Sequence, residues 1–307
     1  MIEKNTKIKQ LQLGASNLIG DDTWRLLFET LGPQLHSLKL SELNDSFTDE
    51  TVQEMARHCG QLQRLKLRTC LKLHEPSLKS ISSMTTLEHL TLAVGQSASS
   101  ETLVDLIQTL GPSLKTLCLE NYAEADDDVL LAIHSNCTRL SKLRLTGSVV
   151  CSDSGFANLF TNWDNPPLPY VDLSDNRDLD KGNPDGPSEA PIGLGSEGFK
   201  ALMKHSGCRL ERLNIHSCRH ISHEALSDIF DGRLQYPLLK DIDLSFVTVV
   251  DDFIMTGIFK SCPNLAKLAV FACFKARDAR IPAGVAVIGL PNAQDAVVIE
   301  GDVVGEL

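Results

Sequence analysis

The chain has 307 residues, a formal net charge of −11 at pH 7 and a sequence pI of about 5.3. This acidity argues against an indiscriminate nucleic-acid binder, because nonspecific affinity for nucleic acid depends on clustered Lys and Arg that neutralise phosphates. No apolar run reaches the roughly 18 residues that a membrane span needs, and residues 1–20 lack the apolar core of a signal peptide. We therefore expect no association with a membrane.

One pattern, L-x-x-L-x-L-x-x-C, recurs along the chain and is typical of the strand half of a leucine-rich repeat. It is complete at residues 62–70, 210–218 and 265–273, and the copy at 168–176 ends in asparagine instead. Looser copies begin at Ile8, Leu35, Leu87, Leu114, Leu140 and Leu239, which makes ten copies in all. Successive copies start 25 to 29 residues apart, apart from one spacing of 42. The sequence thus predicts an α/β leucine-rich-repeat solenoid of about ten repeats, with parallel strands on its concave face.

Helices are predicted between the strands, on the convex face. Acidic or hydroxyl residues stand just before apolar residues at helical spacing, which is the pattern of a capped helix N-terminus. Such starts occur at Asp21, Thr48, Ser99, Asp126, Ser222 and Asp251.

The predicted solenoid occupies residues 1–273, and residues 274–307 form a C-terminal cap or tail. Residues 284–290 and 296–300 are predicted to form two short strands that close the open end of the core. The 42-residue spacing contains an insertion at about 177–195 that is rich in Pro, Gly and Asp. Inserted loops often serve binding, so this segment is a candidate contact element; the alternative is a solvated loop without a partner.

Nine cysteines occur without a C-x-x-C pair, which argues against a zinc framework and favours a reducing compartment. Most are predicted to be small buried side chains, either just after a strand or just before the next one. These are Cys70, Cys218 and Cys273 in the first position, and Cys59, Cys137, Cys208 and Cys262 in the second. Cys118 and Cys151 have no such assignment.

Two motifs are candidates for a ligand site. Residues 193–198, G-L-G-S-E-G, match a dinucleotide fingerprint but follow a Pro-rich loop instead of a core strand. Four histidines and two cysteines lie between 205 and 223, yet the repeat geometry directs Cys218 into the core and His216 onto the concave face. No nucleophile elbow, Walker loop or H-E-x-x-H motif occurs. We expect no metal, no cofactor and no enzymatic activity.

The concave face is the candidate site. Side chains alternate along a strand, so the residues between the leucines face outward. Those of the second to fifth repeats are mostly basic, and the later ones are mixed to acidic, an arrangement suited to a partner with matching charges. The alternative is an ordinary solvated strand surface. The predicted partner-binding residues are Lys39, Arg64, Lys66, Arg68, Lys142, Arg144, Tyr170 and Arg212.

The repeat with its cysteine resembles the cysteine-containing leucine-rich repeats of F-box proteins. More narrowly, segments 159–168, 172–187, 216–222 and 282–295 are similar to a family of fungal nucleotide-excision-repair proteins. The resemblance covers most of the chain. The insertion and the tail are its more specific part, because leucine spacing alone recurs in unrelated proteins.

That resemblance implies a nuclear, non-catalytic subunit that acts in global-genome repair with a chromatin-remodelling ATPase. It also implies a substrate receptor of a cullin ubiquitin ligase, joined through an elongin-C-like adapter. The first repeat begins at Ile8, which leaves no room for adapter-binding helices, so we expect either a fragment or a protein that does not itself recruit the ligase. Three alternatives stay open: a general adapter without a repair role, direct contact with damaged DNA, and a cytoplasmic location.

Overall fold

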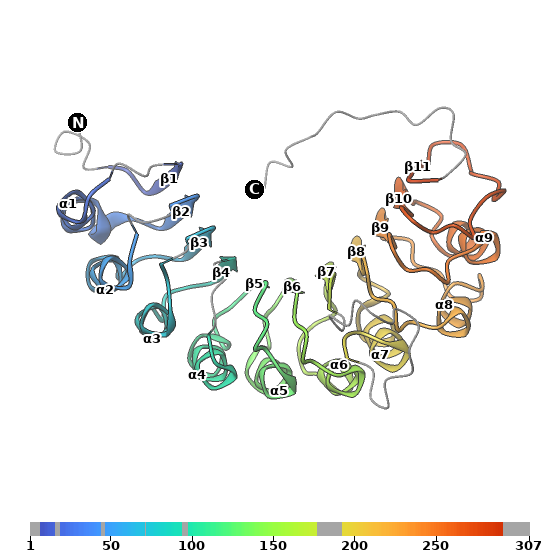
Figure 1. Cartoon of the computed structure of the whole chain (residues 1–307), viewed down its shortest axis with the longest axis horizontal. Helices are drawn as coiled ribbons and strands as arrows, with labels where there is room; N and C mark the ends of the chain where they lie inside the picture. The colour runs from blue at the N-terminus through green and yellow to red at the C-terminus, as the bar shows by residue number, and fades with distance from the viewer. Residues whose placement is uncertain are drawn as a thin grey trace.

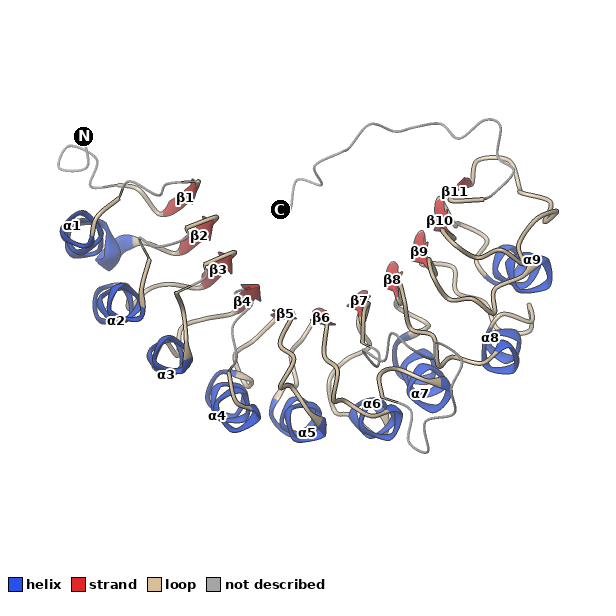
Figure 2. Cartoon of the chain, in the orientation of Figure 1, coloured by secondary structure: helices blue, strands red, loops and turns tan. Residues whose placement is uncertain are grey.

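The computed structural model describes residues 7–15, 19–43, 47–70, 72–93, 98–176 and 192–290. Eleven strands form one parallel sheet in which the spatial order is the chain order, β1 to β11. The chain follows an arc with the strands on the inside and the helices on the outside, shown in chain order in Figure 1 and by element type in Figure 2. The predicted leucine-rich-repeat solenoid is confirmed.

Each predicted repeat contributes one strand, and an eleventh follows. The strands are β1 Gln10–Gly14, β2 Ser37–Ser41, β3 Arg64–Arg68, β4 His89–Ala93, β5 Thr116–Glu120, β6 Lys142–Thr146, β7 Tyr170–Asp172, β8 Arg212–Asn214, β9 Asp241–Asp243, β10 Lys267–Ala269 and β11 Ala286–Ile288. β11 falls within the predicted strand 284–290, whereas the predicted strand 296–300 lies outside the described residues.

The helices lie on the convex face. They are α1 Asp21–Leu31, α2 Asp49–His58, α3 Glu75–Ser82, α4 Ser100–Leu110, α5 Asp127–Asn136, α6 Asp153–Phe160, α7 Ser196–Ser206, α8 His223–Ile229 and α9 Asp252–Ser261, and the 3-10 turn η2 spans Gly32–Gln34. Thr48, Ser99, Asp126, Ser222 and Asp251 cap their helices through the side chain, as predicted. At α1 the N-cap is Gly20, and Asp21 begins the helix. None of the described helices is long and apolar enough to cross a membrane.

The core is a set of leucine rows that run from repeat to repeat. Parallel pairing places equivalent apolar residues side by side, so each one packs against the copy before it and the copy after it. One row consists of Leu38, Leu65, Leu90, Leu117, Leu143, Val171, Leu213, Ile242 and Leu268, all at most 1% exposed. In an isolated repeat, the apolar residue of this row would be exposed to water on both sides, because the neighbouring copies that cover it would be missing.

Buried cysteine and asparagine side chains fix the turn after several strands. The Cys273 thiol lies 3.4 Å from the carbonyl oxygen of Leu244, in the preceding repeat. Asn176 does the same with an amide, donating to the oxygen of Leu145 at 2.7 Å. Burial raises the pKa of Cys273 to about 11, so the thiol stays protonated and can donate. The inward position predicted for Cys70, Cys218 and Cys273 is confirmed, since all three are fully buried.

Cys208 is different, since the structure exposes it although the sequence predicts burial. The buried cysteines of this class stand three residues before the next strand leucine, whereas Cys208 stands two before Leu210. The shorter spacing puts it on the outer side of the turn that follows α7. Cys118 and Cys151, which had no assignment, are both buried.

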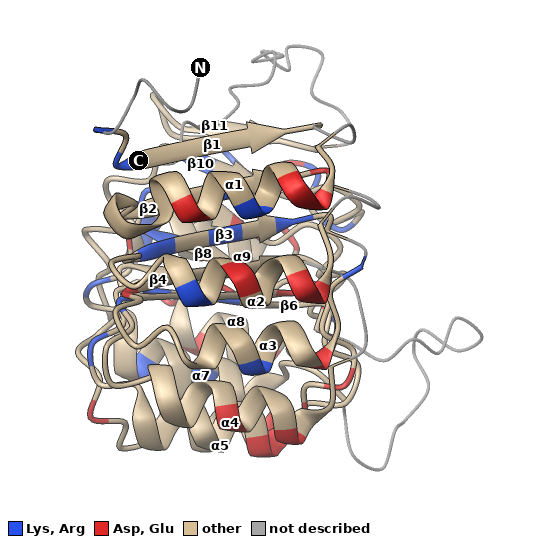
Figure 3. Cartoon of the chain, turned by 90° about the vertical axis from the view of Figure 1, so that its left-hand side faces the viewer, with Lys and Arg blue, Asp and Glu red and all other residues tan. Residues whose placement is uncertain are grey.

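Helix starts are linked from repeat to repeat. An acidic first residue of one helix accepts a hydrogen bond from the backbone at the start of the next. Asp49 accepts from His74 N at 2.9 Å, Glu75 from Ser99 N at 3.0 Å, and Asp127 from Ser152 N at 2.7 Å. In Figure 3, ribbon segments of acidic residues, coloured red, lie at the ends of helices on the side toward which the strand arrows point. We call this side the strand-exit edge. Carboxylates here neutralise the positive ends of the helix dipoles as well as satisfying N–H groups.

Asp153, the first residue of α6, accepts three such hydrogen bonds. Its carboxylate accepts from the backbone N–H groups of Gly195 at 2.9 Å, Glu197 at 3.1 Å and Gly198 at 2.7 Å. The N-cap of α7 is Gly195, which has no side chain to cap the helix, so Asp153 caps it from the neighbouring repeat.

This contact explains the glycines of the fingerprint-like motif. A Cβ atom at Gly195 would lie 2.6 Å from an Asp153 carboxylate oxygen, and one at Gly198 would lie 2.8 Å from the other. The glycines therefore admit a carboxylate of the chain itself to the helix N-terminus, where a dinucleotide-binding fold would place a pyrophosphate.

Replacing Leu65 with alanine tests the leucine row. Leu65 is fully buried between Leu38 and Leu90, and truncation of a buried leucine costs about 2–5 kcal/mol. We expect a loss of that size in the free energy of unfolding measured by urea denaturation. Gln63→Ala, at an exposed position of the same repeat, is the control. Equal midpoints for the two variants would show that Leu65 does not support the core.

Replacing Asp153 with alanine tests the cap between repeats. The change removes the acceptor of three backbone N–H groups at the start of α7, so we expect the free energy of unfolding to fall by about 1–3 kcal/mol. Asp164→Ala removes an exposed carboxylate that follows the same helix and should change stability by less than about 0.5 kcal/mol. The capping role would be refuted if both variants unfolded at the wild-type midpoint in thermal denaturation.

Candidate functional site

All eight predicted partner-binding residues lie on concave-face strands. Lys39 is in β2; Arg64, Lys66 and Arg68 are in β3; Lys142 and Arg144 are in β6; Tyr170 is in β7 and Arg212 in β8. The sheet register pairs Lys39 with Lys66 but inserts β4 and β5 between these residues and β6. The predicted basic residues of β2, β3 and β6, which we call the basic strip, therefore fall into two separate groups. We call Lys39, Arg64 and Lys66 the N-terminal cluster, and Arg68, Glu120, Arg144 and Asp172 the central network.

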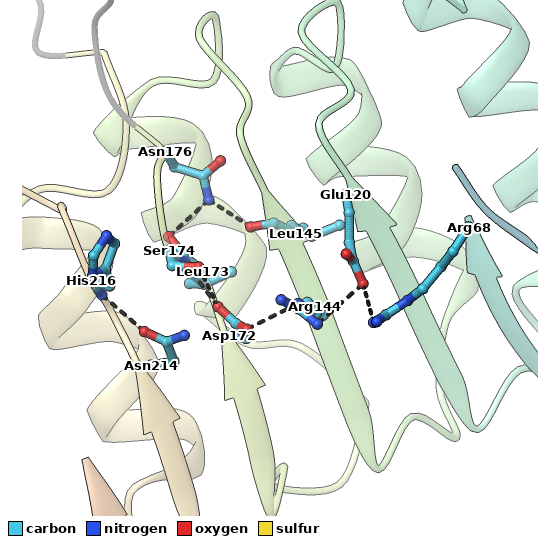
Figure 4. A network of polar contacts seen from close by, with 10 residues as sticks. All are labelled: Arg68, Glu120, Arg144, Leu145, Asp172, Leu173, Ser174, Asn176, Asn214 and His216. Atoms are coloured by element: carbon cyan, nitrogen blue, oxygen red, sulfur yellow. Dashed lines mark hydrogen bonds and ion pairs between the residues drawn. The ribbon is translucent and has the colours of Figure 1, made fainter. Parts of the chain in front are cut away.

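The central network is a chain of ion pairs across five strands. Arg68 Nη2 lies 2.8 Å from Glu120 Oε1, and the same oxygen lies 3.1 Å from Arg144 Nη1. Arg144 Nε lies 3.0 Å from Asp172 Oδ2. Arg68 reaches across β4 because its neighbour in register there is the small Ala93. Figure 4 shows the alternation of base and acid along this chain.

The central network is partly buried, and its opposite charges compensate. Glu120 and Asp172 have side chains only 13% and 2% exposed. Asp172 also accepts from the Ser174 hydroxyl at 2.7 Å and from its backbone N–H at 3.1 Å. Burial lowers the pKa of Arg144, but Asp172 and Glu120 raise it by more, so the net shift is upward. Two guanidinium groups and two carboxylates thus form a fixed surface with no formal net charge.

Tyr170 and Lys142 lie beside this network. Lys142 Nζ sits 4.4 Å from the centre of the Tyr170 ring, within range of a cation–π interaction. Burial, with a contribution from Asp172, raises the pKa of Tyr170 to about 12, so the phenol stays neutral and keeps its hydroxyl donor. Cys118 faces the same side but is buried. Burial raises its pKa, and the thiol is not a nucleophile at neutral pH.

Charge is distributed unevenly along the concave face. In the N-terminal cluster three cations occupy neighbouring positions in β2 and β3, and each is partly exposed. In β4, burial and then the charge of Arg64 lower the pKa of His89, which keeps the imidazole neutral at pH 7. At the other end Arg212 lies 3.7 Å from Asp241, and Asp243 follows in the same strand. Lys267 of β10 also lies next to Asp241 in register. A partner along this face would therefore meet positive surface at β2 and β3 and charges of both signs farther along the sheet.

Glu120 and Asp172 are not among the predicted partner-binding residues. The structure shows that they neutralise two of the predicted basic residues. These ion pairs could be predicted only from the register of the strands, which brings β3 within reach of β5. The spacing of residues within a single repeat does not reveal them. In the histidine-rich segment, Cys218 points into the core and His216 lies 3.6 Å from Asp175. Among the described residues, no three His, Cys, Asp or Glu side chains converge as a metal site would require.

No protein-family model matches the chain. Two curated proteins are similar to it over most of its length. DNA repair protein rhp7 of Schizosaccharomyces pombe is 22% identical over 268 residues, which are 87% of this chain and 45% of that protein. DNA repair protein RAD7 of Saccharomyces cerevisiae is 25% identical over 286 residues, covering 88% of this chain and 46% of that protein. The chain spans about half the length of the curated relatives it matches.

A solved structure is similar to this chain in fold. In a crystal structure of the Rad7 and Elc1 complex in yeast, one chain superposes with a TM-score of 0.79 at 22% identity, covering 94% of this chain and 69% of that chain. The predicted resemblance to fungal repair proteins is confirmed. Over most of its length, this leucine-rich-repeat chain is homologous to the yeast DNA-repair proteins Rad7 and Rhp7.

Proposed function

We propose that the chain is a non-catalytic interaction scaffold of nuclear DNA repair, and that it presents partners to a cullin-type ubiquitin ligase. The similarity to two proteins named for DNA repair, across nearly the whole solenoid, carries this proposal. The ligase role is supported by the solved relative, which was crystallised with Elc1.

The concave face is the proposed binding surface for the partner. Its strands are held rigidly by the sheet, and the central network is already paired before any partner arrives. Little side-chain entropy is then lost there on binding, which favours affinity. The N-terminal cluster supplies positive charge that steers an acidic partner segment, and Asp241 and Asp243 fix its orientation.

Direct binding of DNA by the basic strip is disfavoured by the same contacts. Arg68 and Arg144 are already paired with Glu120 and Asp172, so they bring no net charge to a phosphate. Nonspecific DNA affinity scales with the number of phosphates neutralised. A face that is positive at one end and carries charges of both signs farther along fits a uniformly charged duplex poorly.

Reversal of two charges tests the proposal. In the variant Arg64→Glu with Lys66→Glu, we expect capture of the repair ATPase or ligase substrate from nuclear extract to fall at least tenfold, about 1.4 kcal/mol. Like charges would replace attraction in the N-terminal cluster. The measurement is affinity purification of the tagged chain with quantitative mass spectrometry. Arg68 is left unchanged, because a glutamate there would face Glu120 and disturb the central network.

The matched control is Arg25→Glu with Lys79→Glu, two exposed residues of the convex helices α1 and α3. It changes the net charge by the same amount and should leave capture unchanged. Equal capture by both double variants would exclude the N-terminal cluster as the contact. If the chain instead bound damaged duplex DNA at low salt, and only the concave variant lost that binding, direct DNA contact would replace the scaffold proposal.

A further inference from the structure

The last repeats carry exposed aromatic side chains at the strand-exit edge. Phe246 follows β9, and Phe271 and Phe274 follow β10; they are 39%, 49% and 67% exposed. The backbone N–H of Phe246 donates to the oxygen of Phe271 at 2.7 Å, so the two turns lie side by side. The Phe246 ring meets the His216 ring edge-on with centroids 5.1 Å apart. We call Phe246, Phe271 and Phe274 the aromatic edge.

The backbone that displays Phe274 is fixed on both sides. Cys273 before it and Ala276 after it are fully buried. Asp252 Oδ1 accepts three backbone N–H groups of the following segment, those of Arg277 at 2.8 Å, Asp278 at 2.9 Å and Ala279 at 2.9 Å. The exposure of the ring is thus a property of an ordered turn. Exposed aromatic rings on rigid backbone are typical anchors of protein interfaces.

Positive charge surrounds the same turn. Lys275, Arg277 and Arg280 are exposed, and Asp278 is the one exposed carboxylate of residues 271–281. Asp251 and Asp252, at the adjoining start of α9, are half-buried and already accept hydrogen bonds from backbone N–H groups. The exposed charge of this segment is therefore positive, in a chain whose formal net charge is −11. An acidic segment repelled by much of the molecule would be attracted here. On the other side of the aromatic edge, the charge is negative: Asp243 accepts from Ser245 N at 2.9 Å, and Asp175 lies 3.6 Å from His216.

We propose that the aromatic edge is a second docking site, separate from the concave face, for an acidic peptide segment of a partner protein. An aromatic or long aliphatic side chain of that peptide packs against Phe246, Phe271 and Phe274, and its carboxylates meet Lys275, Arg277 and Arg280. A nucleic-acid strand fits less well. It carries a phosphate at every nucleotide, so a path from Phe274 to His216 would bring phosphates beside Asp243 and Asp175.

A phage-displayed library of random 12-residue peptides, selected on the whole chain, tests the proposal. We expect the enriched peptides to be acidic and to contain at least one aromatic or leucine residue. Their affinity, measured by fluorescence polarisation with the synthetic peptides, should fall at least tenfold for Phe274→Ser and also for Lys275→Glu. Both side chains are exposed, so the variants should keep the wild-type unfolding midpoint.

Leu131→Ser is the matched control, since Leu131 is a similarly exposed apolar residue on α5, and it should bind the peptides as the wild type does. Three results would overturn the proposal: no enriched peptides, peptides that bind all variants equally, or a patch that serves another occupant. The last would appear as binding of a 20-nucleotide single strand, or as self-association in sedimentation, that is lost in Phe274→Ser and kept in Leu131→Ser.

Discussion

Contact between neighbouring repeats is the constraint on which the whole molecule depends. Leu65 is buried only because Leu38 and Leu90 lie on either side of it, and the same holds along each row. Hydrogen bonds from one helix start to the next also join neighbouring repeats, as at Asp127 and Ser152. Stability is then shared between neighbours instead of residing in any single repeat. The curve of the sheet, and with it the concave face, follows from this stacking.

The rigid sheet gives the concave face its character. Side chains from four strands meet in the central network, and a flexible surface could not hold Arg68, Glu120, Arg144 and Asp172 in one chain of contacts. Each partly buried charge there has an opposite charge at hand, which avoids the cost of an uncompensated ion. A partner meets a surface whose pattern of charge already exists before binding. At the strand-exit edge, the buried Cys273 and Ala276 hold Phe274 outward in the same preformed manner.

The sequence was sufficient for the fold because leucine spacing reports directly on which side chains face the core. It also placed Lys39, Arg64 and Lys66 on the correct face, since alternation along a strand is strict. It could not show that Arg68 is paired with Glu120, because that contact joins residues 52 positions apart across an intervening strand. Cys208 was mispredicted for a related reason: a shift of one position moves a side chain from the inside of a turn to the outside. The aromatic edge was missed because Phe246, Phe271 and Phe274 occupy turns, where no periodicity reports on exposure.

The cap formed by Asp153 has a consequence for how this solenoid can change. Residues 177–191 separate two anchored points: Asn176, bonded to the turn of the preceding repeat, and the start of α7, held by Asp153. Both anchors are contacts between residues outside this segment, so neither requires a particular residue at 177–191. We therefore expect changes of sequence or length in this segment to leave both anchors in place. The same two anchors make it a natural place for a protein engineer to graft a foreign recognition loop.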